Sequence, residues 1–183
     1  MKKATILIAV AALFFLSKSK PKTMAKPTTQ TQTDFIKSIA PLVKAEAQKI
    51  NVPYLAMQAQ IILETNWGKS GLWFKYFNPG GIKAVAGQPF VELLTQEDAD
   101  PTKNDGKTKT VKQKFARYKT PAEGIAAYGR ILTNRYFKQY AGKTNDPKQY
   151  IALLQSGKPK YATDDKYAAK VATVIDRLQS MAV

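Results

Sequence analysis

The chain has 183 residues, of which 44% are apolar, and it contains neither cysteine nor histidine. Its length fits one globular domain, and the two missing residue types exclude disulfide bonds, a thiolate nucleophile, an imidazole base and a Cys/His zinc site. The 29 Lys and Arg residues outnumber the 13 Asp and Glu residues and give a net charge of +16. This charge favours a polyanionic partner such as nucleic acid, an anionic membrane or an acidic cell-wall polymer.

Residues 1–16 predict a signal peptide or a membrane anchor. Lys2 and Lys3 precede an uncharged apolar run from Ala4 to Leu16, which is shorter than the roughly twenty residues that span a bilayer. No clear cleavage site follows, so an uncleaved anchor stays open, and a buried helix of a cytosolic protein is the alternative. Residues 17–33 predict a basic flexible tether because they are rich in Lys, Thr, Gln and Pro, and the folded domain is expected at 34–183.

Helical spacing of apolar residues dominates this domain. Pro41 should kink or split the first helix, and the run that ends at Glu64 is apolar enough to be a central helix. Thr120-Pro121-Ala122-Glu123 is a capping box that starts a later helix. The expected helices cover residues 34–50, 53–64, 120–134, 146–157 and from 164 onward, and the expected strands cover 90–95 and 111–118 with a reversal at 104–106. The predicted fold class is mainly α with one β-hairpin.

Glu64 is the leading candidate for chemistry. It closes the most apolar predicted helix and precedes Thr65-Asn66-Trp67-Gly68, so its carboxyl group is expected at the edge of a hydrophobic wall. Burial there would raise its pKa, as a general acid that protonates a leaving oxygen at about pH 6 to 7 requires. From spacing alone, a glutamate ion-paired with a lysine at a helix end is the commoner interpretation, and Trp67 is more often a core residue than a substrate platform.

Five segments resemble, in order, a known family of enzymes. Residues 62–70, Ile-Leu-Glu-Thr-Asn-Trp-Gly-Lys-Ser, are similar to the LESGWGKS signature of the peptidoglycan-cleaving N-acetylglucosaminidases of glycoside hydrolase family 73, which includes flagellar-rod and autolysin domains. Residues 78–83 resemble its N-x-F-G-I-K turn and residues 115–128 its FRxY-xSxxESIxDY segment. Residues 146–151 and 161–168 resemble its DPxxYIxxL and YATDxxYAxK endings. The resemblance implies a lysozyme-like α+β fold, in which a helical domain carries a substrate groove and a β-hairpin flap.

The resemblance also implies site residues. Glu64 takes the position of the family's general acid, and the pattern V-T-E-I-T-T-T-E laid on residues 90–97 puts the second carboxylate at Glu97. Glu92, Asp98 and Asp100 are the alternatives for that second carboxylate. The positions implied for substrate binding are Trp67, Asn78 and Tyr161.

Tyr161 and Gly80 carry further expectations about the substrate groove. Tyr161 would bond the acetamido group of the sugar or, alternatively, pack against the last helix. Gly80 stands where the family has phenylalanine, so the groove wall is expected to be more open there. No metal or other cofactor is expected, because the acidic residues form no Asp-x-Asp-x-Asp calcium loop.

The implied activity is hydrolysis of the β-1,4 bond after N-acetylglucosamine by a monomer that acts on peptidoglycan strands. The alternatives are a lytic transglycosylase or muramidase on the same fold, and a catalytically decayed wall-binding module. A nucleic-acid partner is not expected, because the lysines are spread along the chain without a known binding motif. Inverting, retaining and substrate-assisted routes all stay open, since the sequence does not supply the separation of the carboxylates.

The expected location is the cell envelope. The protein would be periplasmic or secreted, with the basic charge drawing it to an anionic membrane surface or to envelope polymers. A bacterial remodelling enzyme and a phage-borne lysin are both compatible with this sequence.

Overall fold

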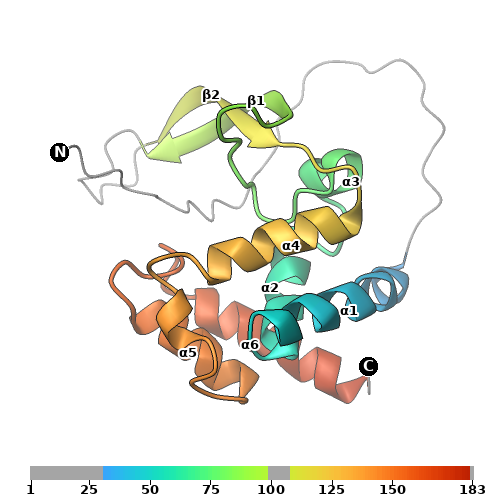
Figure 1. The fold of residues 1–183 in the computed structure, drawn as a ribbon, viewed down its shortest axis with the longest axis vertical. Helices are drawn as coiled ribbons and strands as arrows, with labels where there is room; N and C mark the ends of the chain where they lie inside the picture. Colours follow the sequence, from blue (N-terminus) through green and yellow to red (C-terminus); the bar gives the residue numbers. More distant parts are fainter. Residues whose placement is uncertain (1–30, 99–107, 182–183) are drawn as a thin grey trace.

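The computed structural model describes residues 31–98 and 108–181, and Figure 1 shows their helices grouped below a two-stranded antiparallel hairpin. The prediction of a mainly α fold with one hairpin is confirmed. In chain order the elements are α1 (Gln32–Lys49), α2 (Tyr54–Glu64), α3 (Gly71–Tyr76), β1 (Phe90–Asp98), β2 (Thr108–Ala116), α4 (Pro121–Leu132), the 3-10 helix η1 (Lys138–Tyr140), α5 (Pro147–Ser156) and α6 (Tyr167–Ser180).

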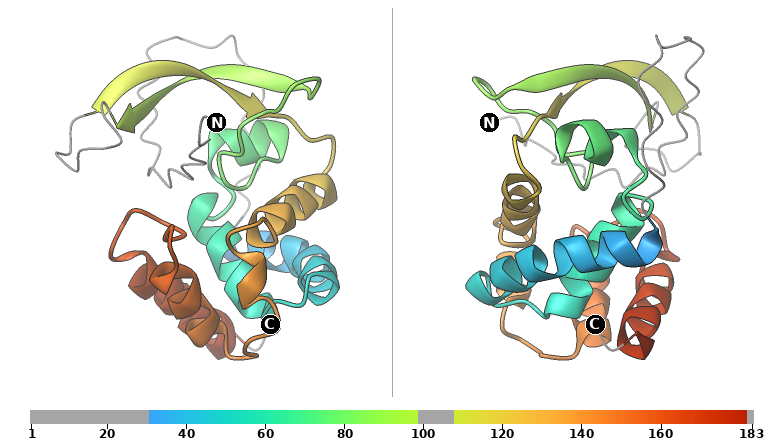
Figure 2. Two further views of the ribbon diagram at one scale, coloured as in Figure 1. Left: turned by 60° about the vertical axis from the view of Figure 1, so that its left-hand side comes forward. Right: turned by 90° about the vertical axis from the view of Figure 1, so that its right-hand side faces the viewer.

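Helix α2 is the centre of the core, as its apolar sequence predicts. Every residue from Ala56 to Ile62 is buried, and the helix packs against α1, α5 and α6. A helix that is apolar on all sides has no face to offer to water, so it must be enclosed by other elements. The C-terminal end of α2 is directed toward α3 and the hairpin (Figures 1 and 2), which puts Glu64 at the boundary between the helical body and the hairpin.

Helix α1 differs from the prediction in two ways. It begins at Gln32, before the predicted boundary at residue 34, because Thr31 forms a capping box with Asp34. It also continues through Pro41 rather than splitting there. Pro41 is exposed, and buried apolar residues on both sides of it hold the helix against the core, so the loss of one backbone hydrogen bond does not end it.

Local capping explains where α4 and α5 start. Thr120 Oγ1 accepts a hydrogen bond from the N–H of Glu123, whose carboxylate accepts one from the N–H of Lys119. The predicted start at Asp146-Pro147 is confirmed, because Asp146 caps α5. Helix α6 starts at Tyr167, later than predicted. Helix α3, which was not predicted, is a single short segment capped by Ser70.

The hairpin is longer than predicted and has two unlike faces. Its strands pair in register from Phe90 with Ala116 to Asp98 with Thr108, and Figure 2 shows it arching over one end of the helical body. On β1, residues 91, 93 and 95 are less exposed than residues 90, 92 and 94, as alternation across a sheet requires.

Several sequence predictions lie outside the described residues. They are the signal or anchor at 1–16, the tether up to residue 30, the reversal at 104–106 and Asp100. Among the residues that the structure describes, no helix is long and apolar enough to cross a membrane.

Candidate active site

Glu64 is the last residue of α2, and a tight turn follows it. Thr65 ends the helix, and its hydroxyl donates to the carbonyl of Ile61 at 2.7 Å and accepts from the N–H of Gly68 at 3.0 Å. The three residues Asn66, Trp67 and Gly68 all have positive φ, at 48°, 58° and 79°. A Cβ at position 68 would lie 2.5 Å from the ring of Phe35, so only glycine fits this close approach.

Glu64 is partly buried and lacks a cationic partner. Within residues 31–98 and 108–181 no lysine or arginine forms an ion pair with it, which rules out, for this part of the chain, a helix-end ion pair. Burial raises the pKa of Glu64 from 4.5 to about 7, against the opposing effect of a hydrogen bond from Tyr167. A carboxyl group with this pKa is protonated in a large fraction of molecules near neutral pH and can donate a proton.

The hydrogen bond to Glu64 is the end of a buried polar chain. The hydroxyl of Tyr167 donates to Glu64 Oε1 at 3.4 Å, and Gln60 Nε2 donates to the same hydroxyl at 3.1 Å. The amide of Gln60 uses one lone pair of the tyrosine oxygen, so it holds that oxygen in place and leaves the hydroxyl proton for donation to Glu64. Helix α2 supplies both Gln60 and Glu64, one turn apart, and α6 supplies Tyr167.

Two further tyrosines complete a neutral wall near Glu64. The hydroxyl groups of Tyr128 and Tyr161 lie 2.6 Å apart, and the rings of Tyr161 and Tyr167 are 5.4 Å apart. All three tyrosines are almost fully buried, and burial raises the pKa of each hydroxyl above its ordinary value. They therefore stay uncharged. Tyr161 does pack against the last helix, which was its alternative interpretation, and its contact with a sugar stays a prediction.

Trp67 and Asn78, the other predicted binding residues, have well-defined surroundings. Trp67 is partly buried against the core, and the guanidinium of Arg177 lies 4.4 Å from its ring. The Asn78 amide is buried; it donates to the carbonyls of Ile82 and Ala116 and accepts from the N–H groups of Ile82 and Gly80. Asn78 therefore joins the 78–82 turn to the end of β2. Contacts of either residue with substrate stay predictions.

Gly80 lies against the ring of Tyr128. A Cβ at this position would lie 3.1 Å from that ring, so the glycine allows the ring to approach the 78–82 turn. The more open groove wall at Gly80 stays a prediction.

The candidates for a second carboxylate lie on β1. Glu97 pairs with Lys109 across the hairpin and Asp98 with Thr108, but their side chains lie outside what the structure describes. Glu92 is exposed and lies 3.9 Å from the ammonium of Lys114. No cluster of three or more His, Cys, Asp and Glu residues that could hold a metal ion occurs in the described part of the chain.

A protonatable glutamate at the end of a buried helix, walled by neutral tyrosines in a helical body that carries one β-hairpin, defines the class of protein as a lysozyme-like glycoside hydrolase domain. Residues 40–180 match the glucosaminidase family model, which is described as mannosyl-glycoprotein endo-β-N-acetylglucosaminidase. The chain belongs to this family, as the resemblance predicted.

Relatives and solved structures agree with this family. The chain is 29% identical to the exo-glucosaminidase LytG of Bacillus subtilis, over 97% of this chain and 66% of that protein. It is 28% identical to the peptidoglycan hydrolase FlgJ of Salmonella typhimurium, over 88% of this chain and 51% of that protein. The chain thus spans about half to two thirds of the length of these curated relatives. The catalytic domain of the Listeria monocytogenes autolysin Auto superposes with a TM-score of 0.71 at 28% identity, over 86% of this chain and 89% of that one.

Proposed function

We propose that the chain hydrolyses the β-1,4 bond after N-acetylglucosamine in peptidoglycan strands, with Glu64 as the general acid. The observation that carries this proposal is a partly buried carboxyl group that forms no ion pair with a lysine or arginine of residues 31–98 and 108–181, and whose burial raises its pKa to about 7. The names of the relatives, a glucosaminidase and a peptidoglycan hydrolase, support the same substrate class.

The mechanism follows from the surroundings of Glu64. The protonated carboxyl group donates its proton to the glycosidic oxygen while oxocarbenium character develops on the sugar. The neutral tyrosine wall favours the protonated acid before this step, because a charged carboxylate is poorly solvated there. After the transfer, the hydroxyl of Tyr167 stabilises the new carboxylate. Gln60 keeps that hydroxyl aimed in advance, so Tyr167 is a positioning residue for the acid.

Glu97 is the proposed second carboxylate. It would activate water from the far face of the sugar or, if the acetamido group of the substrate attacks first, steady that intermediate and then deprotonate water. Glu92 is the less favoured choice, because it is exposed and lies 3.9 Å from the ammonium of Lys114. The proposed substrate contacts are the ring of Trp67 and the hydroxyl of Tyr161, while Asn78 supports the turn that carries the hairpin.

We further propose an envelope location, as a monomer, for this activity. The similarity to an autolysin of Enterococcus faecalis and to LytG supports an exported protein. The apolar run from Ala4 to Leu16 and the lysines of the tether are the features that would hold it at the membrane surface.

Glu64→Gln tests the proposed acid. This change removes the transferable proton and preserves the shape of the side chain, so hydrolysis of purified peptidoglycan should fall by at least about a hundredfold. The matched control is Asp176→Asn, which makes the same chemical change at an exposed residue of α6 that forms an ion pair with Lys148 of α5. This control should leave the rate within about twofold. A Glu64→Gln protein that is folded and keeps more than about a hundredth of the rate would exclude Glu64 as the acid.

A further inference from the structure

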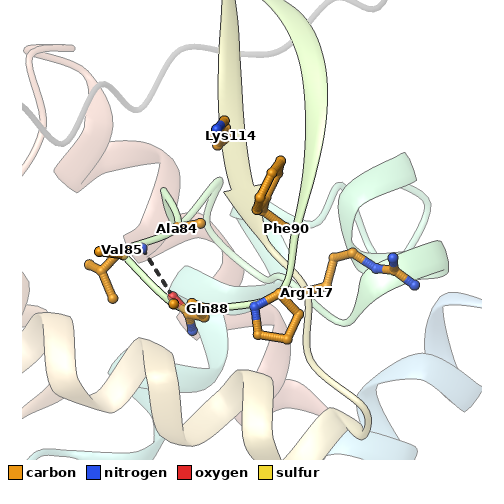
Figure 3. A pocket seen from close by; sticks show the side chains of 9 residues that line it. Ala84, Val85, Gln88, Phe90, Lys114 and Arg117 are labelled. Carbon is orange, nitrogen blue, oxygen red and sulfur yellow. Dashed lines mark hydrogen bonds between the residues drawn. The ribbon is translucent and has the colours of Figure 1, made fainter.

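A second hollow surface lies at the base of the hairpin, apart from Glu64. One pocket of about 650 Å³ is lined by residues 84–90 together with Lys114 and Arg117 (Figure 3). An adjoining pocket of about 410 Å³ shares Gln88, Pro89 and Arg117 with the first and continues along α4 from Glu123 to Arg130. We call the two together the hairpin-base groove. Neither pocket is lined by Glu64 or by the tyrosines of the candidate active site.

The groove opens on the exposed face of the hairpin. Phe90 and Lys114 are both exposed and belong to the strand series that alternates with the less exposed residues 91, 93 and 95. A ligand in the hairpin-base groove would therefore occupy the exposed face of the hairpin.

The charge of the groove is strongly positive. Four cationic side chains line it, which are Lys114, Arg117, Lys119 and Arg130. The carboxylate in the lining is Glu123, and its Oε2 already accepts a hydrogen bond from the N–H of Lys119 at 2.9 Å. Within the described ranges, Arg117, Lys119 and Arg130 make no ion pair, and Lys114 has only the 3.9 Å contact with Glu92. Lys119 and Arg130 thus offer unpaired donors to an anionic ligand, whereas the guanidinium of Arg117 lies 5.3 Å from the centre of the Tyr76 ring.

Apolar groups share this surface with the cations. Val85 is 71% exposed and Phe90 is 43% exposed, and the ammonium of Lys114 lies 4.4 Å from the centre of the Phe90 ring. The labelled side chains in Figure 3 show Phe90 close to Lys114, with Val85 and Gln88 on the loop below. A bare polyanion would use only the cations of such a surface. A ligand with small apolar side chains between carboxylates would use both kinds of group.

We propose that the hairpin-base groove binds the short peptides that branch from peptidoglycan strands. These peptides combine alanine methyl groups with free carboxylates, which matches the apolar and cationic lining; the choice of this ligand rests on the proposed function. Binding one peptide there while a sugar is bound at Glu64 would attach the enzyme to the strand at two points and lengthen its stay.

The test is a binding measurement on the full chain carrying Glu64→Gln, so that the wall material is not degraded. The combined change Arg117→Gln, Lys119→Gln and Arg130→Gln should weaken binding to purified sacculi at least about tenfold at about 150 mM salt. The matched control removes three exposed lysines elsewhere, Lys44, Lys138 and Lys143, and should weaken binding less than about threefold. Val85→Glu, at a position with little packing to lose, should also weaken binding.

Sacculi whose peptides have been removed by an amidase supply the second arm. The groove variants and their parent should bind this stripped glycan equally. Equal losses in the groove variant and the lysine control, or a groove variant that still prefers peptide-bearing sacculi, would overturn the proposal. Cleavage of short soluble peptide-free glycans by the groove variant with Glu64 restored should match that of the wild-type protein. If the wild-type protein binds through the groove but cleaves no glycan, the proposed function fails while this inference stands.

Discussion

Replacing Glu64 with glutamine should stabilise the folded chain far more at about pH 8 than at about pH 4. Burial holds the pKa of Glu64 at about 7 in the folded state, against 4.5 for the ordinary group. Below pH 4.5 both the folded and the unfolded chain keep the proton. As the pH rises from there to about 7, the unfolded chain ionises first and the folded chain loses stability. At about 1.4 kcal/mol per pH unit, this interval corresponds to about 3 kcal/mol of unfolding free energy.

Urea unfolding followed by circular dichroism measures this difference directly. Relative to the wild-type protein, Glu64→Gln should gain about 3 kcal/mol more at pH 8 than at pH 4, because glutamine does not ionise. Asp176→Asn, in an exposed ion pair, should change the same difference by less than about 1 kcal/mol. If the gain of Glu64→Gln is the same at both pH values within about 0.5 kcal/mol, the carboxyl group is not desolvated and the reasoning that makes it an acid at neutral pH fails.

Two further predictions concern the neighbours of the acid. Tyr167→Phe removes the hydrogen bond that lowers the pKa of Glu64, so the alkaline limb of the pH–rate profile should move up by about one pH unit. The control is Tyr150→Phe, because the buried Tyr150 hydroxyl has no partner among the described residues, and it should leave the alkaline limb in place. An alkaline limb that Tyr167→Phe does not move would contradict the positioning role of Tyr167. Glu97→Gln should reduce the rate of peptidoglycan hydrolysis by a factor of about 10² or more, while the rate of Glu92→Gln should stay within about threefold of the wild-type rate. The reverse order of the two rates would assign the second carboxylate to Glu92.

The parts of the fold that could be predicted are those set by neighbouring residues. Asp146-Pro147 and Thr120-Pro121 start helices where predicted, because a capping side chain and a proline at the first position act within one turn. The effect of Pro41 could not be predicted, since it depends on which face of α1 is packed and which is exposed. Helix α3 is too short for apolar periodicity to show, and only the cap at Ser70 could have indicated it.

In the candidate site, too, only the features set by neighbouring residues could be predicted. The burial of Glu64 follows from the apolar run of α2, so its raised pKa was predictable. Tyr167 was missed as a partner because it comes from α6, far along the chain, and only the packing of α2 against α6 brings it to Glu64. One signal was available: Gln60 is one of two glutamines in a mostly apolar helix, it lies one turn before Glu64, and a buried polar residue needs a partner.

The most direct test of the proposed activity is the chemistry of the new chain ends. Purified peptidoglycan is digested with the wild-type protein, reduced with borohydride and examined by mass spectrometry, with Glu64→Gln as the blank. Hydrolysis after N-acetylglucosamine predicts reduced N-acetylglucosamine at the new ends, produced only by the wild-type protein. Anhydromuramic ends would show a lytic transglycosylase, and reduced muramic ends would show a muramidase; either result would contradict the proposed function.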